Sequence, residues 1–240
     1  MNTEAWDRIA AKSPLPPIPT TVAFGADLPA DDDLRLCGEV TGKRVLDLGC
    51  GAGENAVVLA GRGAHVIAVD ASAGRLAAAR RLADAAEVRV EWHQSDASDL
   101  AFLRADSIDL ALATGLLGEV DDLDRLLRQV HRVLRPGAPL VFSFDHPVAL
   151  CVARDDAEPG SLPLGAREVR RSWFDGSPCP IRHAGEEISV IPRTIASIFA
   201  SLHRAGYRTE LLLEPEPMRS DDPGPILPTT VVWRARKEGV

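Results

Sequence analysis

The chain has 240 residues, of which 45% are hydrophobic and 26% are charged. These values are typical of one globular domain with a covering subdomain, and they argue against a disordered chain. The formal net charge of −8 argues against a nucleic-acid partner, because nonspecific affinity for nucleic acids comes from clustered lysines and arginines. We therefore expect no nucleic-acid partner, and a chain that is a monomer or a homodimer.

Neither a membrane segment nor a metal or disulfide framework is indicated. No apolar stretch approaches the roughly 20 residues that span a bilayer. The opening MNTEAWDRIA carries acidic residues where a secretory signal would be basic, so we expect a cytoplasmic protein. The four cysteines are scattered and form no CxxC pair, which predicts no metal site and no disulfides.

Residues 1–40 are interpreted as a lead-in or lid, since residues 13–33 are rich in proline and end in three aspartates. From Lys43, short apolar runs alternate with helical periodicity, which is typical of β-α units and a parallel sheet. The predicted elements, in order, are strand 44–48, a helix after Gly53, strand 65–69, helix 72–85, strand 88–93, strand 107–113, helix 123–134 and strand 139–144.

Prolines and glycines interrupt this rhythm in residues 146–190, which we interpret as an insertion that covers the site. A short strand is considered at residues 168–174. A last helix follows, with Ile195, Ile198, Phe199 and Leu202 on one face, and two strands at 207–213 and 229–235. The fold class is α/β, with a doubly wound sheet in a single domain over residues 1–240.

Three glycines, Gly49, Gly51 and Gly53, stand where the first strand turns into the first helix. Ligands of open parallel sheets bind beyond the carboxyl ends of the strands, so this loop is the expected cofactor seat. Alternate glycines let the backbone approach a ligand without Cβ clashes. A purely structural turn is the alternative, although one glycine suffices for most turns.

Two cofactors fit the glycines. Gly51 to Ala56 match the dinucleotide pattern G-x-G-x-x-A, and Asp70 lies at the distance of a ribose-binding acid. Asp47, however, would repel a pyrophosphate, whereas it attracts the amino and sulfonium groups of S-adenosylmethionine (SAM). Asp96 adds a third acid at a strand end. Each acid alone is also explained as a helix cap or turn residue, but together they favour SAM.

The sequence resembles the class I SAM-dependent methyltransferases, in particular the methyltransferase type 11 group, from Trp6 to Pro147. The resemblance rests on four segments: VLDLGCGAGENA, VIAVDAS, SDASDL and LLRQVHRVLRPGAPLVFS. It implies a Rossmann-like sheet of seven strands, mostly parallel with an antiparallel last strand. It also implies SAM as cofactor, S-adenosylhomocysteine as product and a small-molecule acceptor.

The resemblance assigns the cofactor contacts residue by residue. They are Asp47, Gly49, Cys50, Gly51 and Gly53 around the methionine part, Asp70 and Ala71 at the ribose, Asp96 and Ala97 at the adenine, and Thr114 and Gly115 near the sulfonium. The chain departs from the family at Glu119, where many relatives have histidine. Trp6 is expected to replace the tyrosine with which some relatives cover the cofactor.

For the catalytic base we select His146, which follows the strand ending at residue 144, because histidine titrates near neutral pH. A turn residue before Pro147 is an equally open interpretation. Asp145 is expected to orient His146, and Glu119 and His183 are weaker candidates.

Two features of the insertion are left with alternatives. Trp173 and Phe174 are interpreted either as the lining of an acceptor pocket or as core residues. The second feature is the arginine cluster, interpreted either as a binding site for an acidic acceptor or as a solvated, charged strand edge; it consists of Arg167, Arg170 and Arg171.

The resulting hypothesis is methyl transfer from SAM to an oxygen, nitrogen or carbon atom of a small molecule, with a secondary metabolite among the acceptors considered. An NAD-dependent oxidoreductase and a SAM-binding protein without catalysis are the alternatives.

Overall fold

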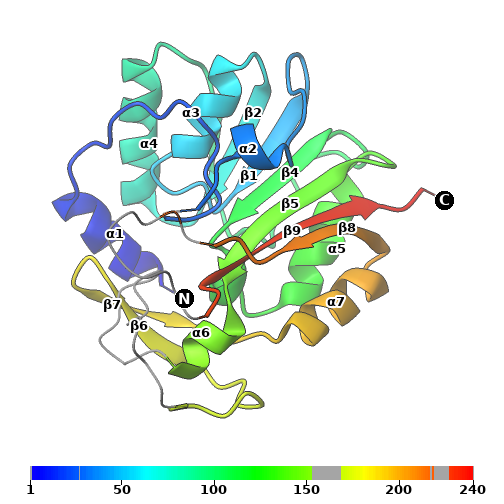
Figure 1. Cartoon of the computed structure of the whole chain (residues 1–240). Coiled ribbons are helices and arrows are strands. Elements are labelled where there is room, and N and C mark those ends of the chain that lie inside the picture. Colours follow the sequence, from blue (N-terminus) through cyan, green and yellow to red (C-terminus); the bar gives the residue numbers. More distant parts are fainter. Residues whose placement is uncertain (1, 27, 153–168, 217, 219–226, 240) are drawn as a thin grey trace.

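The computed structural model describes residues 2–26, 28–152, 169–216, 218 and 227–239. A central seven-stranded sheet carries helices on both faces, and a two-stranded hairpin stands beside it (Figure 1). The strands of the sheet are β1 Arg44–Leu48, β2 His65–Asp70, β3 Glu91–Gln94, β4 Leu110–Thr114, β5 Pro139–Asp145, β8 Tyr207–Leu213 and β9 Thr230–Lys237. In the described ranges, no helix combines the length and apolar content that a membrane crossing requires.

The sheet order is β3-β2-β1-β4-β5-β9-β8. Strands β1 to β5 are parallel, whereas β9 is antiparallel to both of its neighbours. The expected Rossmann-like sheet of seven strands with an antiparallel last strand is therefore confirmed. The strand order reverses between β1 and β4, so the loops that follow these two strands diverge and open a crevice at the carboxyl edge.

The helices are α1 Thr3–Lys12, α2 Asp31–Leu34, α3 Glu54–Gly61, α4 Ala73–Ala85, α5 Leu123–Val133, α6 Pro147–Val152 and α7 Ile195–Arg204, with a 3-10 turn, η1, at Leu117–Glu119. The predicted helices after Gly53 and at 72–85 and 123–134 are confirmed within one residue. Three helices, α1, α2 and α6, were not predicted. The aspartate run forms the short helix α2, and Asp31 accepts hydrogen bonds from the amides of Leu36 and Cys37, which follow the helix.

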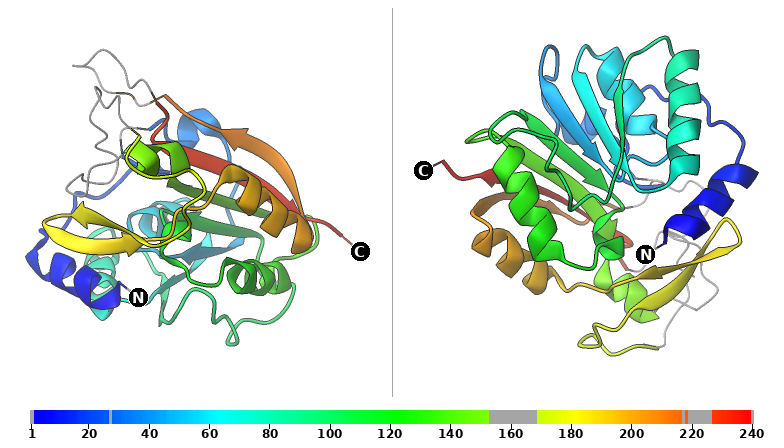
Figure 2. Two further views of the ribbon diagram at one scale, coloured as in Figure 1. Left: turned by 90° about the horizontal axis from the view of Figure 1, so that it is seen from below. Right: turned by 180° about the vertical axis from the view of Figure 1, so that it is seen from behind.

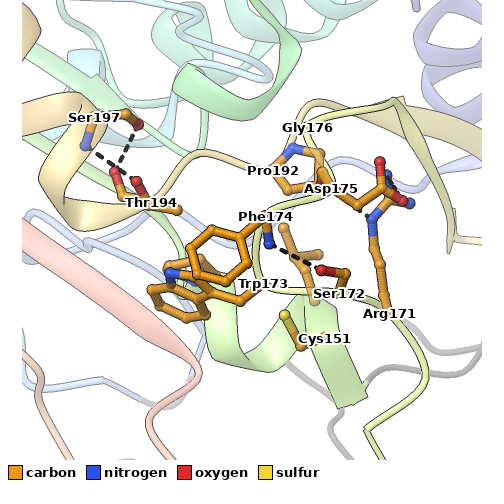
Figure 3. Close-up of a pocket in the computed structure, with 12 residues that line it drawn as sticks. Cys151, Arg171, Ser172, Trp173, Phe174, Asp175, Gly176, Pro192, Thr194 and Ser197 are labelled. Carbon is orange, nitrogen blue, oxygen red and sulfur yellow. Dashed lines mark hydrogen bonds and ion pairs between the residues drawn. The ribbon is translucent and has the colours of Figure 1, made fainter.

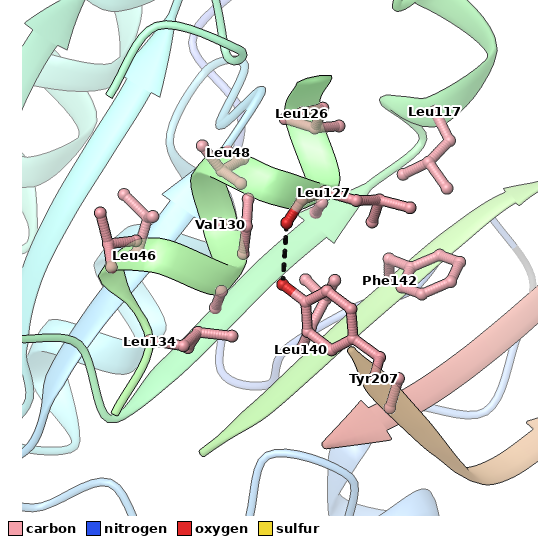
Figure 4. Close-up of a cluster of buried hydrophobic side chains, with 14 of the residues drawn as sticks. Leu46, Leu48, Leu117, Leu126, Leu127, Val130, Leu134, Leu140, Phe142 and Tyr207 are labelled. Carbon is pink, nitrogen blue, oxygen red and sulfur yellow. Dashed lines mark hydrogen bonds between the residues drawn. The ribbon is translucent and has the colours of Figure 1, made fainter. Parts of the chain in front are cut away.

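Helices α5 and α7 cover one face of the sheet, as the turned views show (Figure 2). Leucines and valines recur at helical spacing along α5 and bury themselves against β1, β4 and β5. Tyr207 joins this cluster, and its hydroxyl donates to the Leu127 carbonyl at 3.3 Å (Figure 4). In α7, Ile198 and Leu202 are buried but Phe199 is 54% exposed, so the predicted apolar face is narrower than expected.

Helix α3 and residues 22–26 and 28–40 cover the opposite face. Val22 and Phe24 are buried there, so this part of the predicted lid is an integral layer of the core. Asn55 of α3 holds it in place: its amide nitrogen donates to the Ala23 carbonyl and its oxygen accepts from the Ala23 amide, both at 2.9 Å. The start of α3, which follows the glycine loop, is thereby fixed.

The insertion contains an antiparallel hairpin, β6 Cys179–His183 and β7 Glu186–Val190, which was not predicted. The strand considered at 168–174 is wrong, because residues 169–174 form no strand; Glu168 lies outside the described residues. The hairpin alternates buried and exposed residues, and its apolar side turns toward the carboxyl edge of the sheet.

Candidate active site

A cavity of about 860 Å³ opens at the carboxyl edge, where the strand order reverses. Its walls come from the glycine loop, the ends of β2, β4 and β5, the N-terminal helix α1 and the hairpin. Nine of the eleven predicted cofactor residues line it: Gly49, Cys50, Gly51, Asp70, Ala71, Asp96, Ala97, Thr114 and Gly115. Asp47 and Gly53 lie behind this lining.

The glycine loop needs its glycines for two physical reasons. Gly51 and Gly53 have φ angles of +59° and +86°, a region that favours glycine. A Cβ on Gly53 would lie 2.8 Å from the Cβ of Ala79, and one on Gly51 would lie 2.7 Å from a guanidinium nitrogen of Arg75. Gly53 therefore permits the packing of α3 on α4, and Gly51 permits a side chain to lie flat on the loop.

Asp70 ties the loop to the next strand end. One carboxylate oxygen accepts from the Gly51 amide at 2.9 Å, and the other accepts from the Ser72 amide at 2.8 Å. Ser72 in turn caps α4 by accepting from the Arg75 amide. The carboxylate of Asp70 is buried by these contacts but still borders the cavity, where a ligand hydroxyl can reach it.

Asp47 is 1% exposed and lies in the middle of β1, behind the loop. Neither of its carboxyl oxygens has a hydrogen-bond partner among the described residues. Burial raises the pKa of Asp47 to about 8, and the nearby carboxylates of Glu54 and Asp70 contribute. Asp47 therefore lies behind the cavity lining with its carboxyl mostly protonated at neutral pH, and its contact with the methionine part stays a prediction.

The adenine-side and sulfonium-side positions lie at the predicted edge. Asp96 is exposed at the rim and accepts from the amide and hydroxyl of Ser98 at 2.7 and 2.6 Å. Thr114 ends β4, and its hydroxyl accepts a long, 3.4 Å hydrogen bond from Asn55. These positions belong to one continuous wall with Gly115 and Ala97.

Helix α1 closes the cavity from the side. The Trp6 indole donates to Glu119 at 2.6 Å, and the Asn2 amide donates to the same oxygen at 2.8 Å. The guanidinium of Arg75 lies 4.1 Å from the Trp6 ring, which is a cation–π distance. The expectation that Trp6 covers the site is consistent with its place in the cavity wall.

The same helix binds the hairpin, which lies beside it in Figure 2. Arg8 and Lys12 both pair with Glu186, at 2.8 and 2.5 Å. Asn2 and Ser189 exchange two hydrogen bonds, of 2.8 and 3.0 Å. Helix α1 thus bridges α4, which follows the Asp70 end of β2, and the hairpin on the other side of the cavity.

We expect the Trp6→Phe variant to be less stable by about 1–2 kcal/mol, because a hydrogen bond to a half-buried carboxylate is lost while the ring is kept. Chemical denaturation would measure the free energy of unfolding. Trp173→Phe, which lies outside this cavity, is the control. Equal stability of the Trp6 variant and the wild type would show that the bond to Glu119 contributes nothing.

His146 does not line the cavity and is 5% exposed. Its Nδ1 accepts from the Val148 amide at 3.1 Å, and its Nε2 lies 2.8 Å from a Glu214 oxygen. Both ring nitrogens are therefore engaged, and the prediction that His146 is the base does not fit this geometry. The alternative interpretation, a residue that fixes the turn before Pro147, does.

Asp145 takes the place that was predicted for His146. It ends β5 in the cavity wall, and burial raises its pKa to about 6, with a contribution from Glu119. Burial also raises the pKa of Glu119, although the hydrogen bonds from Trp6 and Asn2 oppose this effect. The ring of His183, also in the wall, lies 5.1 Å from that of Trp6.

Trp173 and Phe174 line a separate cavity of about 250 Å³ beside α6 (Figure 3). They are 40% and 90% exposed, so neither packs in the core. Arg171 also belongs to this second cavity and pairs with Asp175 at 3.1 Å. In this structure the aromatic pair and Arg171 lie away from the main cavity; Arg167 lies outside the described residues.

Residues 45–137 match the family model described as a methyltransferase domain. Over this segment the chain carries a methyltransferase domain. The matched segment contains the cofactor side of the cavity, with the glycine loop, Asp70 and Asp96, and it also contains Glu119. The resemblance to this class, on which the cofactor assignment rested, is confirmed.

Curated relatives include a demethylmenaquinone methyltransferase from Clavibacter sepedonicus, 40% identical over 107 residues, which are 45% of this chain and 43% of the relative. A ubiquinone biosynthesis O-methyltransferase from Azorhizobium caulinodans is 31% identical over 147 residues, 60% of this chain and 58% of the relative. The chain thus matches only about half the length of these relatives.

Among solved structures, a SAM-dependent methyltransferase from Mesorhizobium loti has a TM-score of 0.64 at 29% identity, covering 85% of this chain and 96% of that one. A candidate SAM-dependent methyltransferase from Listeria monocytogenes has a TM-score of 0.71 at 24% identity, covering 87% of this chain and 96% of that one. The second likeness shows the fold alone.

The cavity's own residues fit SAM better than a dinucleotide. Asp47 is an orphaned buried acid, and Glu54 and Asp70 stand on either side of the loop. A pyrophosphate at this loop would face the carboxylates of Glu54 and Asp70, whereas the amino and sulfonium groups of SAM are cations. The rival dinucleotide interpretation is disfavoured by this charge arrangement.

Sequence reasoning missed three contributors to the site. Asn55 anchors residue 23, Arg75 lies on Gly51, and Asn2 reaches Glu119. Asn55 carried a usable signal, because a polar residue in the otherwise apolar α3 is expected to have a buried partner. No comparable signal in the sequence pointed to Arg75 or Asn2, since their partners are distant in sequence.

Proposed function

We propose that the protein transfers the methyl group of SAM to a small-molecule acceptor and releases S-adenosylhomocysteine. The observation that carries this proposal is the two-sided cavity. Its cofactor side comes from the matched methyltransferase segment, and its other side comes from the apolar hairpin and the end of β5. The proposal treats residues 1–240 as one domain, in which the insertion at 146–190 covers the acceptor.

The residues would divide the cofactor among them. Asp70 would accept hydrogen bonds from the ribose hydroxyls, and the loop at Gly49 to Gly51 would contact the methionine part. Asp96 and Ala97 would border the adenine, and Thr114 and Gly115 the sulfonium edge. When bound, SAM supplies an electrophilic methyl group, so the protein's main task is to align the acceptor and exclude water.

Asp145 is the proton acceptor that the geometry favours. With a pKa of about 6, it is mostly ionised at neutral pH but still basic enough to take a proton. It ends a strand in the sheet, so its carboxyl is held by rigid backbone. The relatives named for quinone biosynthesis support a small-molecule acceptor, which remains a proposal for this chain.

The experiment that tests the function measures thermal stability with S-adenosylhomocysteine and with NADH, and then product formation from methyl-labelled SAM. Stabilisation by S-adenosylhomocysteine alone supports the proposal. Stabilisation by NADH alone would favour the oxidoreductase. Cofactor binding without labelled product from a broad extract of small molecules would favour the non-catalytic alternative.

We expect Asp70→Asn to weaken S-adenosylhomocysteine binding by about 10- to 100-fold, because charge-assisted hydrogen bonds are worth about 1.5–3 kcal/mol. Both the loop contact at Gly51 and the ligand contact depend on this carboxylate. Titration calorimetry would measure the affinity. Asp99→Asn, an exposed acid outside the cavity, is the control, and an unaltered affinity in the Asp70 variant would refute the ribose assignment.

A further inference from the structure

The acceptor side of the cavity has an apolar wall. Ile181 and Ile188 are paired across the hairpin, and Val190 follows on the same face of β7. All three are less than 5% exposed and line the cavity together with Phe144 of β5. An acceptor held here therefore presents an apolar body to the hairpin.

Two carboxyl groups stand at this wall. Glu119 lies in η1, and one of its oxygens, Oε2, receives both hydrogen bonds from Trp6 and Asn2. The carboxyl of Asp145 accepts no hydrogen bond from any described residue. The two groups also repel each other, because Glu119 contributes to the raised pKa of Asp145. Both carboxyls line the cavity, on elements that contact each other, so a ligand meets two neighbouring acceptors of hydrogen bonds.

The charges around the cavity are unequal. Among the described residues that line it, the only lysines or arginines are Arg75 and Arg125, and Arg75 lies on the Trp6 ring. The acids are Glu54, Asp70, Asp96, Glu119, Asp121, Asp122 and Asp145. An anionic acceptor is repelled by this field, whereas a cationic one is attracted.

Methyl transfer itself favours nitrogen in such a field. The acceptor nitrogen forms a bond to the methyl carbon while the carbon–sulfur bond breaks, and the electron pair of that bond stays on sulfur. Positive charge therefore moves from sulfur to nitrogen, and the adjacent carboxylate of Glu119 stabilises it. An amine enters as its ammonium ion, gives one proton to Asp145, and is then a neutral nucleophile. An oxygen acceptor would instead have to lose its proton first, and the resulting oxyanion would lie beside two carboxyl groups.

We propose that the acceptor is a primary or secondary amine on an apolar body, held between Glu119 and Asp145 with its body against the hairpin. This proposal rests on the function proposed above. It names the substrate class of the same cavity and the two residues that recognise its nitrogen.

The test compares probes that differ only in their polar group: tryptamine, tryptophol and indole-3-propionate, and likewise phenethylamine, 2-phenylethanol and 3-phenylpropionate. Each is titrated into the protein saturated with S-adenosylhomocysteine, and each is incubated with methyl-labelled SAM. We expect at least one amine to bind about tenfold or more tighter than its alcohol and carboxylate counterparts, and to acquire label.

The variants Asp145→Asn and Glu119→Gln locate the effect. Each is expected to lower amine affinity about tenfold while alcohol affinity stays the same, and Glu238→Gln, an exposed acid far from the cavity, is expected to change neither. Unchanged S-adenosylhomocysteine affinity shows that the variants are folded.

Each other outcome counts against a specific statement. If S-adenosylhomocysteine does not bind the wild type, the proposed function itself fails. If it binds, but alcohols or carboxylates bind as well as amines, or neither amine binds, the amine proposal is overturned. Amine binding that is unaffected by both variants also overturns it, because the nitrogen then lies elsewhere.

Discussion

The Asp47→Asn variant is expected to gain stability relative to the wild type as the pH rises. The difference between their free energies of unfolding should increase by about 4 kcal/mol between about pH 5 and about pH 8. The folded protein holds the Asp47 proton up to a pKa of about 8, whereas an unfolded aspartate loses it near pH 4. Between these values the folded state binds more protons, so wild-type stability falls by about 1.4 kcal/mol per pH unit. Asparagine carries no such proton.

Denaturant unfolding of both proteins at several pH values measures this difference. Asp84→Asn, an exposed acid on α4, is the control and should show no such divergence from the wild type. At pH 5, the asparagine variant should be slightly less stable than the wild type, because its amide is buried without a partner. Parallel stability curves for the two proteins would mean that Asp47 is ionised in the folded state across this range.

The Gly53→Ala variant is expected to lose about 2–4 kcal/mol of stability, and its melting temperature should fall by about 5–10 °C. The added Cβ would meet the Cβ of Ala79 at 2.8 Å and its Cα at 3.2 Å, and the latter belongs to helix backbone that cannot yield cheaply. The φ angle of +86° adds strain. Because α3 must then shift, we also expect weaker binding of S-adenosylhomocysteine.

Gly38→Ala separates the two causes. Its φ of +66° carries the same kind of strain, but nothing lies within 4 Å of the added Cβ. It should therefore cost only about 1–2 kcal/mol. Calorimetric melting of both variants, with ligand titrations alongside, gives the comparison. A Gly53 variant no less stable than the Gly38 variant would show that α3 and α4 separate without penalty.

The alternation of strands and helices could be predicted because parallel strands are buried on both faces and appear as short apolar runs. Strand β1 was predicted with its observed bounds. The glycine loop was recognisable because glycines at alternate positions allow backbone conformations and close contacts that other residues do not. Most of the cofactor side of the cavity follows from this loop. These features are local in sequence, so their signals stand close together.

The acceptor side was not predictable in the same way. The hairpin contains Pro180 and several charges, which weaken its strand pattern. Helix α1 buries only Ala5 and Ile9, and its functional contacts reach residues more than 100 positions away. The choice between Asp145 and His146 depends on which of two adjacent residues faces the cavity, and periodicity alone does not decide it.

The placement of the cavity walls has an evolutionary consequence. The cofactor wall lies within residues 45–137, whereas the acceptor wall is drawn, apart from Glu119, from α1, the end of β5, the hairpin and Thr230 at the start of the antiparallel strand β9. Changes in these outer segments would leave the glycine loop and its acids untouched. Selection is therefore free to exchange one acceptor for another while the methyl donor is retained, and grafting the outer segments between homologues is the natural route to redesign specificity.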